Sequence, residues 1–390
     1  MSCGMSFHVG ASRPRNRQPM SFLFQIAVIA ALLGILPPVS GIVAQAVCIG
    51  TSVHAFGAKG DGQTDDTAAV QSAIDAAAAA GGGAVVFNTT RYFTTGTFVV
   101  PAGVVLCGSI EGPFDNGNGA NPGVTTIAPT LLVTNTSSPF LTLNGVNSGV
   151  SDLLFHYPNQ VRASAASPTA YPYTILVNAP GTKVVRCMAS NAYNFLDIES
   201  GKVIARDLFI GAYNIGINVD HASDHVTIRH ILQTVFWDTW EGRFPSTIDT
   251  WVMNHGTGFV VNRAESIELH DLALFTRYAG IVLTDSPDTT QSPRCGYGSG
   301  GDINFDGVQY GVIATASTAR GYEFSNVTIN PLTGLGVDSQ AVAQLRSGGS
   351  SPPNLLIEGG AVLGPWTLGP FPTPAAGHLK AVNIFGFDLP

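Results

Sequence analysis

Short apolar segments recur along most of the chain, separated by turns rather than by long polar stretches. One set of strand-like segments contains Val150, Val184, Val203, Val226 and Ile267. The valines at 184, 203 and 226 are 19 and 23 residues apart. A repeat of about 20 to 25 residues made of strands and turns is typical of a solenoid, in which each coil buries its apolar side against its neighbours.

A second set of strands begins with glycine, at Gly216, Gly258, Gly280 and Gly311, with spacings of 42, 22 and 31 residues. The longest interval has two interpretations: one coil with a long insertion, or two coils. A β-sandwich is the structural alternative, but its Asn-Gly and Asp-Gly hairpin signals are too few here. The pattern therefore predicts one all-β solenoid domain over residues 50–390.

A helix is predicted near the N-terminal end of this repeat. Thr64 or Asp65 is the expected N-cap of a helix that begins near Thr67, because short polar side chains accept hydrogen bonds from free helix N–H groups. The glycines at 81–83 end it, since glycine adopts left-handed dihedrals freely. Its buried face is expected at positions three and four residues apart: Val70, Ala73, Ile74 and Ala77.

The residues from Val53 to Gly108 also carry a family resemblance. FGAKGDGQTDDTAAVQSAIDAAAAAGGGAVVF, followed by PAGVVLCG, resembles the opening of the pectate-lyase-like superfamily, within its rhamnogalacturonase/epimerase-like (pectate lyase 3-type) group. The resemblance implies a single-stranded right-handed parallel β-helix with an N-terminal capping α-helix. Superfamily members include polysaccharide hydrolases, lyases, epimerases and the shafts of phage tailspikes, so the resemblance implies an architecture and not a reaction.

Residues 1–46 have the pattern of a signal peptide. A basic segment at 13–17 precedes an apolar run at 22–36, and Ala44-Gln45-Ala46 is a small-x-small cleavage site. The alternative is a membrane anchor, but the apolar run is short for a span. A start at Met20 would remove the arginines, so the true start is open. We expect a secreted or periplasmic protein with no membrane attachment after cleavage.

The net charge of the chain limits the classes of ligand that it is expected to bind. The formal net charge is −8, and removal of Arg13, Arg15 and Arg17 with the signal leaves 15 basic against 26 acidic groups, or −11. Such a surface disfavours nonspecific nucleic-acid binding. It also disfavours polyanionic glycans, unless calcium or a local basic patch compensates.

Four cysteines remain after the signal, and none forms a CxxC pair, so we expect no structural zinc, and no cofactor or metal is predicted. Cys48 with Cys107 is the first disulfide to test, and Cys187 is expected to be a packed core thiol. The cluster that includes His221 and His225 is interpreted as turn residues rather than metal ligands.

Two insertions between coils, the first at residues 156–173 and the second at residues 236–255, are candidate ligand-binding loops. Exposed aromatic rings can stack on sugar faces, and nearby acids can act on a glycosidic oxygen. The same aromatics could instead pack the loops onto the solenoid wall, and both interpretations are open. The residues singled out for substrate contact are Tyr157 in the first insertion and Trp237, Trp240 and Glu241 in the second.

Four further elements are similar, in order, to those of polygalacturonase-type hydrolases: Asn218-Val219-Asp220, Asp238, His255-Gly256 and Arg277. The resemblance implies Asp220 and Asp238 as the acid and base of an inverting hydrolysis, with carboxyls about 6.5 to 9.5 Å apart. His255 would orient or relay the proton, and Arg277 would contact substrate. The family's second Asp and the Lys of its Arg-x-Lys element have no counterpart here.

Two classes of function follow from these patterns. The first is an exported enzyme acting on a polysaccharide, with glycoside hydrolysis favoured over a lyase or epimerase, because few lysines are available as a base. The second is a noncatalytic glycan-binding or structural β-helix. The sequence determines neither which polysaccharide is bound nor the oligomeric state.

Overall fold

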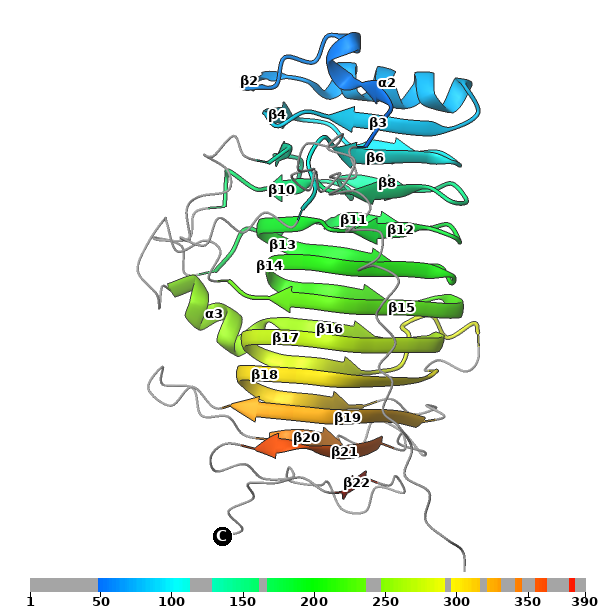
Figure 1. Ribbon diagram of the computed structural model, residues 1–390. Helices are drawn as coiled ribbons and strands as arrows, with labels where there is room; N and C mark the ends of the chain where they lie inside the picture. The colour runs from blue at the N-terminus through cyan, green and yellow to red at the C-terminus, as the bar shows by residue number, and fades with distance from the viewer. Residues whose placement is uncertain are drawn as a thin grey trace, which may run out of the picture. The chain divides into compact units, whose positions relative to one another are not determined.

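The computed structural model describes residues 48–112, 128–160, 167–235, 247–291, 296–315, 321–330, 341–345, 355–362 and 379–382 of the chain. Their strands follow one another as stacked coils (Figure 1). Every pairing between described strands is parallel, which excludes the β-sandwich alternative. None of the helices in these ranges combines the length and hydropathy that a membrane span needs.

The described elements are short strands in the first coils and longer strands that turn corners in the later ones. The helices are η1 (3₁₀, Val53–Phe56), α2 (Thr67–Ala79) and α3 (Thr247–His255). The short strands are β1 (Thr51–Ser52), β2 (Asp61–Asp65), β3 (Gly83–Phe87), β4 (Arg91–Thr94), β5 (Phe98–Val100), β6 (Val104–Gly108), β7 (Thr130–Val133), β8 (Leu141–Leu143), β9 (Gly149–Ser151), β10 (Leu154–His156), β11 (Tyr173–Val177) and β12 (Lys183–Val185). The later strands are β13 (Met188–Ile198), β14 (Val203–Val219), β15 (Ala222–Gln233), β16 (Thr257–Val261), β17 (Ala264–Leu283), β18 (Tyr297–Ala314), β19 (Gly321–Asn330), β20 (Ala341–Leu345), β21 (Leu355–Val362) and β22 (Leu379–Val382).

The registers sort these strands into three parallel ladders, which we name A, B and C in the order in which each coil passes through them. Ladder A contains β3, β6, β9 and β12 and the first part of β14. Ladder B contains β4, β7 and β10 and the first part of β13. Ladder C contains β5, β8 and β11, the ends of β13 and β14, and β16. The architecture is a right-handed parallel β-helix, as the sequence predicts.

From β9 onward, the corner between ladders A and B is made by a single residue with positive φ in the described coils. Asp207, Asp271 and Asp302 have φ of 57°, 56° and 55°. Among residues other than glycine, short polar side chains tolerate this left-handed conformation best. One such residue bends the chain without ending the strand, so β14, β17 and β18 continue from one ladder to the next.

The interior is a continuous apolar core, in which aromatic rings stack from coil to coil. Phe98 contacts Phe140 with ring centroids 5.4 Å apart, Phe140 contacts Phe155 at 6.0 Å, and Phe155 contacts Phe195 at 6.4 Å. These rings are at most 2% exposed. No coil could bury such rings alone, so the stack is the unit that folds.

The register of the first strand set differs in part from the sequence prediction. Val203 pairs with Val226 as expected. Val184 pairs with Ala205 instead of Val203, so the first spacing is 21 residues and not 19. The sequence pattern missed this because Ala205 is small and weakly apolar, yet it faces the core with 0% exposure.

The glycine-led strands lie in register on ladder C. Gly216, Gly258 and Gly280 follow one another on β14, β16 and β17. A Cβ on Gly258 would lie 2.6 Å from the carbonyl oxygen of Gly280, so side chains are excluded from this row. Because β14 pairs directly with β16, the 42-residue interval is one coil with an insertion, and α3 lies in that insertion (Figure 1).

Helix α2 begins at Thr67 and buries the predicted face: Val70, Ala73, Ile74 and Ala77. Its N-cap residue is Asp66, one position later than predicted. The carboxylate of Asp65 accepts from the N–H and hydroxyl of Thr67, whereas that of Asp66 accepts from the N–H groups of Lys59 and Gly60. Asp66 therefore fixes the preceding loop instead of capping the helix with its side chain.

The cysteine predictions are confirmed where the structure describes them. Cys48 forms a disulfide with Cys107, across a sequence separation of 59 residues. Cys187 is buried, and burial raises the pKa of its thiol to about 12. Cys295 lies outside the described residues.

Candidate functional site

A cluster of titratable side chains lies at the carboxyl end of ladder C. Glu199, Asp220 and Asn262 directly follow the strands of three consecutive coils. The backbone N–H of each donates to a carbonyl of the preceding coil at 2.8 to 2.9 Å. Parallel pairing therefore holds these side chains one above another at the strand spacing of about 4.8 Å.

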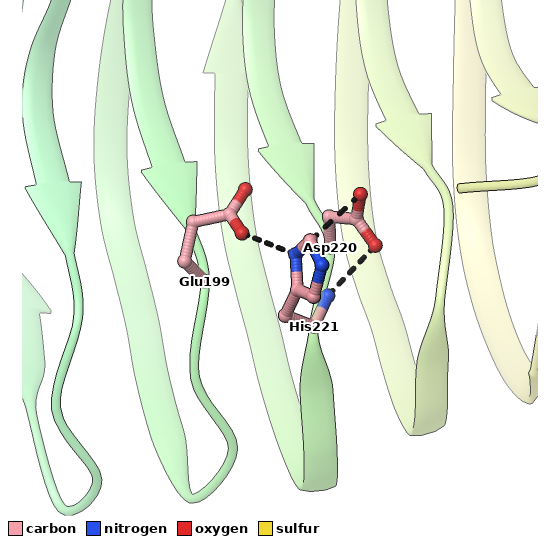
Figure 2. A group of neighbouring side chains, drawn as sticks. All are labelled: Glu199, Asp220 and His221. Carbon is pink, nitrogen blue, oxygen red and sulfur yellow. Dashed lines mark hydrogen bonds and ion pairs between the residues drawn. The ribbon is translucent and has the colours of Figure 1, made fainter. Parts of the chain in front are cut away.

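His221 places its ring between two carboxylates of this cluster. Its Nδ1 lies 2.5 Å from Glu199 Oε2, and its Nε2 lies 3.1 Å from Asp288 Oδ2 (Figure 2 shows the first contact). Burial lowers the pKa of His221, but the hydrogen bonds to Asp288 and Glu199 outweigh it and raise the pKa overall. The ring is therefore favoured as a cation shared by two anions.

Asp220 is the most buried member of the cluster, at 3% exposure. Its Oδ1 accepts from the backbone N–H groups of His221 at 2.7 Å and Arg263 at 3.3 Å. Its Oδ2 accepts from the Ser286 hydroxyl at 2.8 Å. Ser286 and Asp288 belong to the segment that follows β17, so Asp220 and His221 together attach that segment to ladder C.

Asp197 lies two residues before Glu199, on the outer face of the same ladder. It pairs in register with Asn218, whose amide donates to Asp197 Oδ1 at 2.7 Å, and Asn262 donates in turn to Asn218 Oδ1 at 2.8 Å. Burial, with smaller contributions from Glu199 and Asp220, raises the pKa of Asp197 to about 7. Asp197 is therefore a carboxyl that can still hold its proton near neutral pH.

Three of these residues also satisfy the spacing of a metal site. Glu199, Asp220 and His221 each offer a ligand atom, and these atoms lie within 4.8 Å of one another (Figure 2). Carboxylates and an imidazole form a donor set that divalent cations use. Both ring nitrogens of His221 face carboxylate oxygens, however, which is the arrangement of a protonated ring. The geometry fits an ion-pair network better than a metal centre.

The structure separates Asp220 from His255, which the sequence interpretation placed in one catalytic group. His255 ends α3, where its Nδ1 lies 2.8 Å from the Trp251 carbonyl and its ring stacks on Trp251 at 4.5 Å. β16 begins after it at Thr257, and Asp220 lies beside Asn262 at the other end of that strand. A strand rises about 3.3 Å per residue, so these ends are about 17 Å apart.

Arg277 lies inside the molecule with 0% exposure. Its Nη1 donates to the Ala212 carbonyl at 3.0 Å, and burial lowers its pKa to about 9. Ala212 and Arg277 belong to β14 and β17, and the coil between them leaves the wall here for the insertion that contains α3. Arg277 thus joins β17 to β14 through a buried hydrogen bond.

Tyr157 is buried as well, at 1% exposure. Its hydroxyl lies 2.7 Å from Thr174 Oγ1, and its ring packs edge-on against Tyr171 with centroids 4.8 Å apart. Burial raises the pKa of its hydroxyl. These contacts pack the first insertion onto the wall. Asp238, Trp237, Trp240 and Glu241 lie outside the described residues.

Comparison with known proteins places this fold in a family. A family model described as "Rhamnogalacturonase A/epimerase, pectate lyase-like" matches residues 50–239. This match and the parallel β-helix together fit the pectate-lyase-like superfamily. No curated protein sequence matches this pectate-lyase-like chain.

Several solved structures are similar to this chain at low sequence identity, and those with a TM-score above 0.5 share its fold. The catalytic unit of a GH87 α-1,3-glucanase from Streptomyces thermodiastaticus strain HF3-3 matches with a TM-score of 0.53 and 14% identity, over 88% of this chain and 70% of the other. The tailspike protein of E. coli bacteriophage HK620, in complex with a pentasaccharide, matches with a TM-score of 0.51 and 10% identity, over 86% and 67%. The A-module of the Azotobacter vinelandii mannuronan C-5 epimerase AlgE6 matches with a TM-score of 0.41 and 16% identity, over 87% and 100%.

Sequence reasoning missed Asp197, Glu199 and Asp288 in this pectate-lyase-like chain. A signal for the first two was present. Asp197-x-Glu199 and Asn218-x-Asp220 are the same polar-apolar-polar pattern at an interval of 21 residues, one coil apart. Asp288 has no such signal, because it lies in a segment between strands and joins the cluster only through folding.

Proposed function

We propose that this protein acts on a polysaccharide and that the carboxyl end of ladder C hydrolyses a glycosidic bond. The match to the pectate-lyase-like superfamily supports the substrate class. Two solved structures with the same fold also support it, an α-1,3-glucanase and a tailspike in complex with a pentasaccharide. The reaction itself is argued from the carboxyl groups of this chain.

The observation that carries the proposal is the relation between Asp197 and Asp220. They lie one coil and two residues apart, which places their Cα atoms about 8 Å apart for strands spaced by about 4.8 Å. This backbone spacing is compatible with the separation of the two carboxyls in inverting hydrolases, about 6.5 to 9.5 Å, which leaves room for a water molecule. Glu199 lies only two residues after Asp197 on the same chain, and its carboxylate is held by His221.

The different environments of the two carboxyls assign their roles. Asp197, with a pKa raised to about 7, donates its proton to the glycosidic oxygen as the bond to the anomeric carbon breaks. Asp220 accepts a proton from the water that attacks that carbon, so both protons are accounted for. Ser286 and His221 hold the Asp220 carboxylate in position. We also propose that residues 1–46 direct export of the protein to the compartment in which it meets such polysaccharides.

Incubation of the mature protein with neutral and acidic polysaccharides tests the reaction. Release of reducing ends supports hydrolysis, and absorbance of an unsaturated uronide would indicate a lyase instead. Asp197→Asn is expected to lower the hydrolysis rate at least about 100-fold, because general acid catalysis contributes about 10² to 10⁴. The control is Asp224→Asn, an exposed carboxylate outside the cluster. An unchanged rate in Asp197→Asn would remove this residue from the mechanism.

A noncatalytic glycan-binding protein is the second candidate, and one observation favours it. Both oxygens of Asp220 and both ring nitrogens of His221 already have hydrogen-bond partners within the protein. A cluster that is saturated in this way stabilises the fold without any reaction. Binding of a polysaccharide with no product of either kind would select this candidate.

A further inference from the structure

A groove of about 380 Å³ crosses ladder A. Val105, Gly149 and Lys183 succeed one another in the register of β6, β9 and β12. Because Gly149 has no side chain, the wall is hollow between its two neighbours. The groove is formed by ladder A and its turns, and none of its lining residues belongs to the carboxylate cluster of ladder C.

The groove is lined by cationic side chains. Lys183, Arg186 and Arg206 come from two neighbouring coils and all line it. Arg206 has a side chain that is 48% exposed. In a mature chain that we expect to carry a net charge of −11, the lining of the groove holds these three basic residues and no acidic one. Such a lining attracts anionic ligands despite the overall charge.

The partners of these cations differ, and the difference matters for binding. Arg186 is held by Asp152 through two hydrogen bonds of 2.7 and 2.9 Å, with Glu111 at 3.6 Å. Arg206 pairs with Asp207, its neighbour in sequence. Lys183 has no ion-pair partner among the described side chains. One ammonium group is therefore available, beside two guanidinium groups whose positions are fixed.

The spacing of the cations suits an extended ligand. Val185 pairs with Arg206, so Lys183 and Arg206 lie one coil and two residues apart, with Cα atoms about 8 Å apart. A single small anion would need donors that converge within hydrogen-bond distance of one point. Donors spread along a groove instead match a chain that repeats its negative charges.

We propose that this groove binds an acidic polysaccharide through the carboxylates of its uronic acid units. The choice of a glycan rests on the proposed function, whereas the requirement for negative charge rests on the groove itself. The site is distinct from the cluster on ladder C. It holds a segment of the polymer to the protein wall while another segment is free to reach ladder C.

The test measures binding of an oligogalacturonide to the mature protein by calorimetry, with its methyl-esterified form as the uncharged control. Lys183→Ala/Arg206→Ala is expected to weaken binding of the acidic form about tenfold, through the loss of two charged contacts. The matched control is Lys202→Ala/Arg229→Ala, which removes the same charge from ladder A or its turns but outside the groove. It is expected to change the affinity less than about twofold. Increasing salt should weaken binding of the acidic form only.

Each outcome decides between this inference and the proposed function. Binding of the acidic form that the groove variant loses, without any cleavage, supports the groove and contradicts hydrolysis. Cleavage with equal affinity in the groove and control variants overturns the groove. Equal affinity for the acidic and the esterified oligogalacturonide also overturns it. So does an affinity for a single-stranded oligonucleotide that equals the affinity for the acidic oligogalacturonide. Circular dichroism spectra and thermal unfolding of both double variants establish that they are folded.

Discussion

Asp197 and Asp288 carry the same side chain, yet their pKa values move in opposite directions within one cluster. Hydrogen bonds from the side chain and backbone of Thr290, and then from His221, lower the pKa of Asp288 to about 2. Burial and the neighbouring Glu199 raise that of Asp197 to about 7. Hydrogen-bond donors surround the carboxylate of Asp288, whereas that of Asp197 is buried beside other carboxylates. The pKa values of the two groups are therefore far apart.

We expect the thermal stability of the protein to fall as the pH rises from about 5 to about 8. The folded-state pKa of Asp197 is above its ordinary 3.8, so the favourable protonated form is lost as the pH approaches about 7. The raised pKa of His221 acts in the same direction, since its stabilising charge is present below 6.5 and lost above it. Asp288 titrates below this range.

Thermal unfolding midpoints measured across this pH range, for the wild type and for Asp197→Asn/His221→Gln, test the prediction. The double variant is expected to show a weaker dependence on pH. An equal slope in both proteins would mean that other groups dominate the titration.

At the scale of elements, the corners and the glycine row determine how the coils stack. Each positive-φ corner lets one strand serve two ladders, and Gly216, Gly258 and Gly280 let neighbouring coils approach closely on ladder C. A side chain in that row would meet the backbone of the next coil and the core residues of ladder B. The coils are therefore held in register by sterics as well as by hydrogen bonds.

Gly280→Ala is expected to lower the free energy of unfolding by about 1 to 3 kcal/mol, the usual cost of overpacking a core. Its Cβ would meet the ring of Phe305 and, at 2.6 Å, the carbonyl oxygen of Gly311. Urea denaturation monitored by circular dichroism measures the change. Thr142→Ala on β8, where the side chain is only half-buried, is the control and should stay within about 0.5 kcal/mol. Equal stability of Gly280→Ala and the wild type would show that the row has room for a methyl group.

At the scale of the whole molecule, stability is shared between neighbouring coils, and the two ends have the fewest neighbours. The disulfide from Cys48 to Cys107 ties the first described residue to β6, across the loop that contains η1 and α2. The buried face of α2 belongs to the same core as the coils. The N-terminal end is thus held by a covalent link as well as by apolar packing.

Removing this link with Cys48→Ala/Cys107→Ala is expected to cost about 2 to 4 kcal/mol, because the unfolded chain gains freedom across a separation of 59 residues. Urea denaturation with and without a reductant measures it. The reductant should lower the stability of the wild type toward that of the variant and leave the variant unchanged. A wild type that is insensitive to reductant in both the folded and unfolded states would contradict the bond.

The sequence by itself determined the solenoid, the buried face of α2 and the set of glycine-led strands, but not whether one coil or two span the interval from Gly216 to Gly258. Each of these follows from local apolar spacing or from a residue type with one steric role, so no distant contact is needed to predict them. It also indicated the pair of cysteines in the disulfide, although three pairings were open. The predicted register of Val184 was wrong because its true partner, Ala205, faces the core but is too small to give a clear apolar signal.

Only the tertiary structure decided which polar residues meet. Asp220 and His255 are 35 residues apart in sequence and belong to neighbouring coils. His255 precedes the first residue of β16, however, whereas Asp220 lies beside the residue that follows the last one. Asp288 is 67 residues from His221 and contacts it. Order along the chain places a residue in a coil, whereas its position along the strand and the path of the turns decide its neighbours. That is why Arg277, chosen for substrate contact, proved to be buried and hydrogen-bonded to β14.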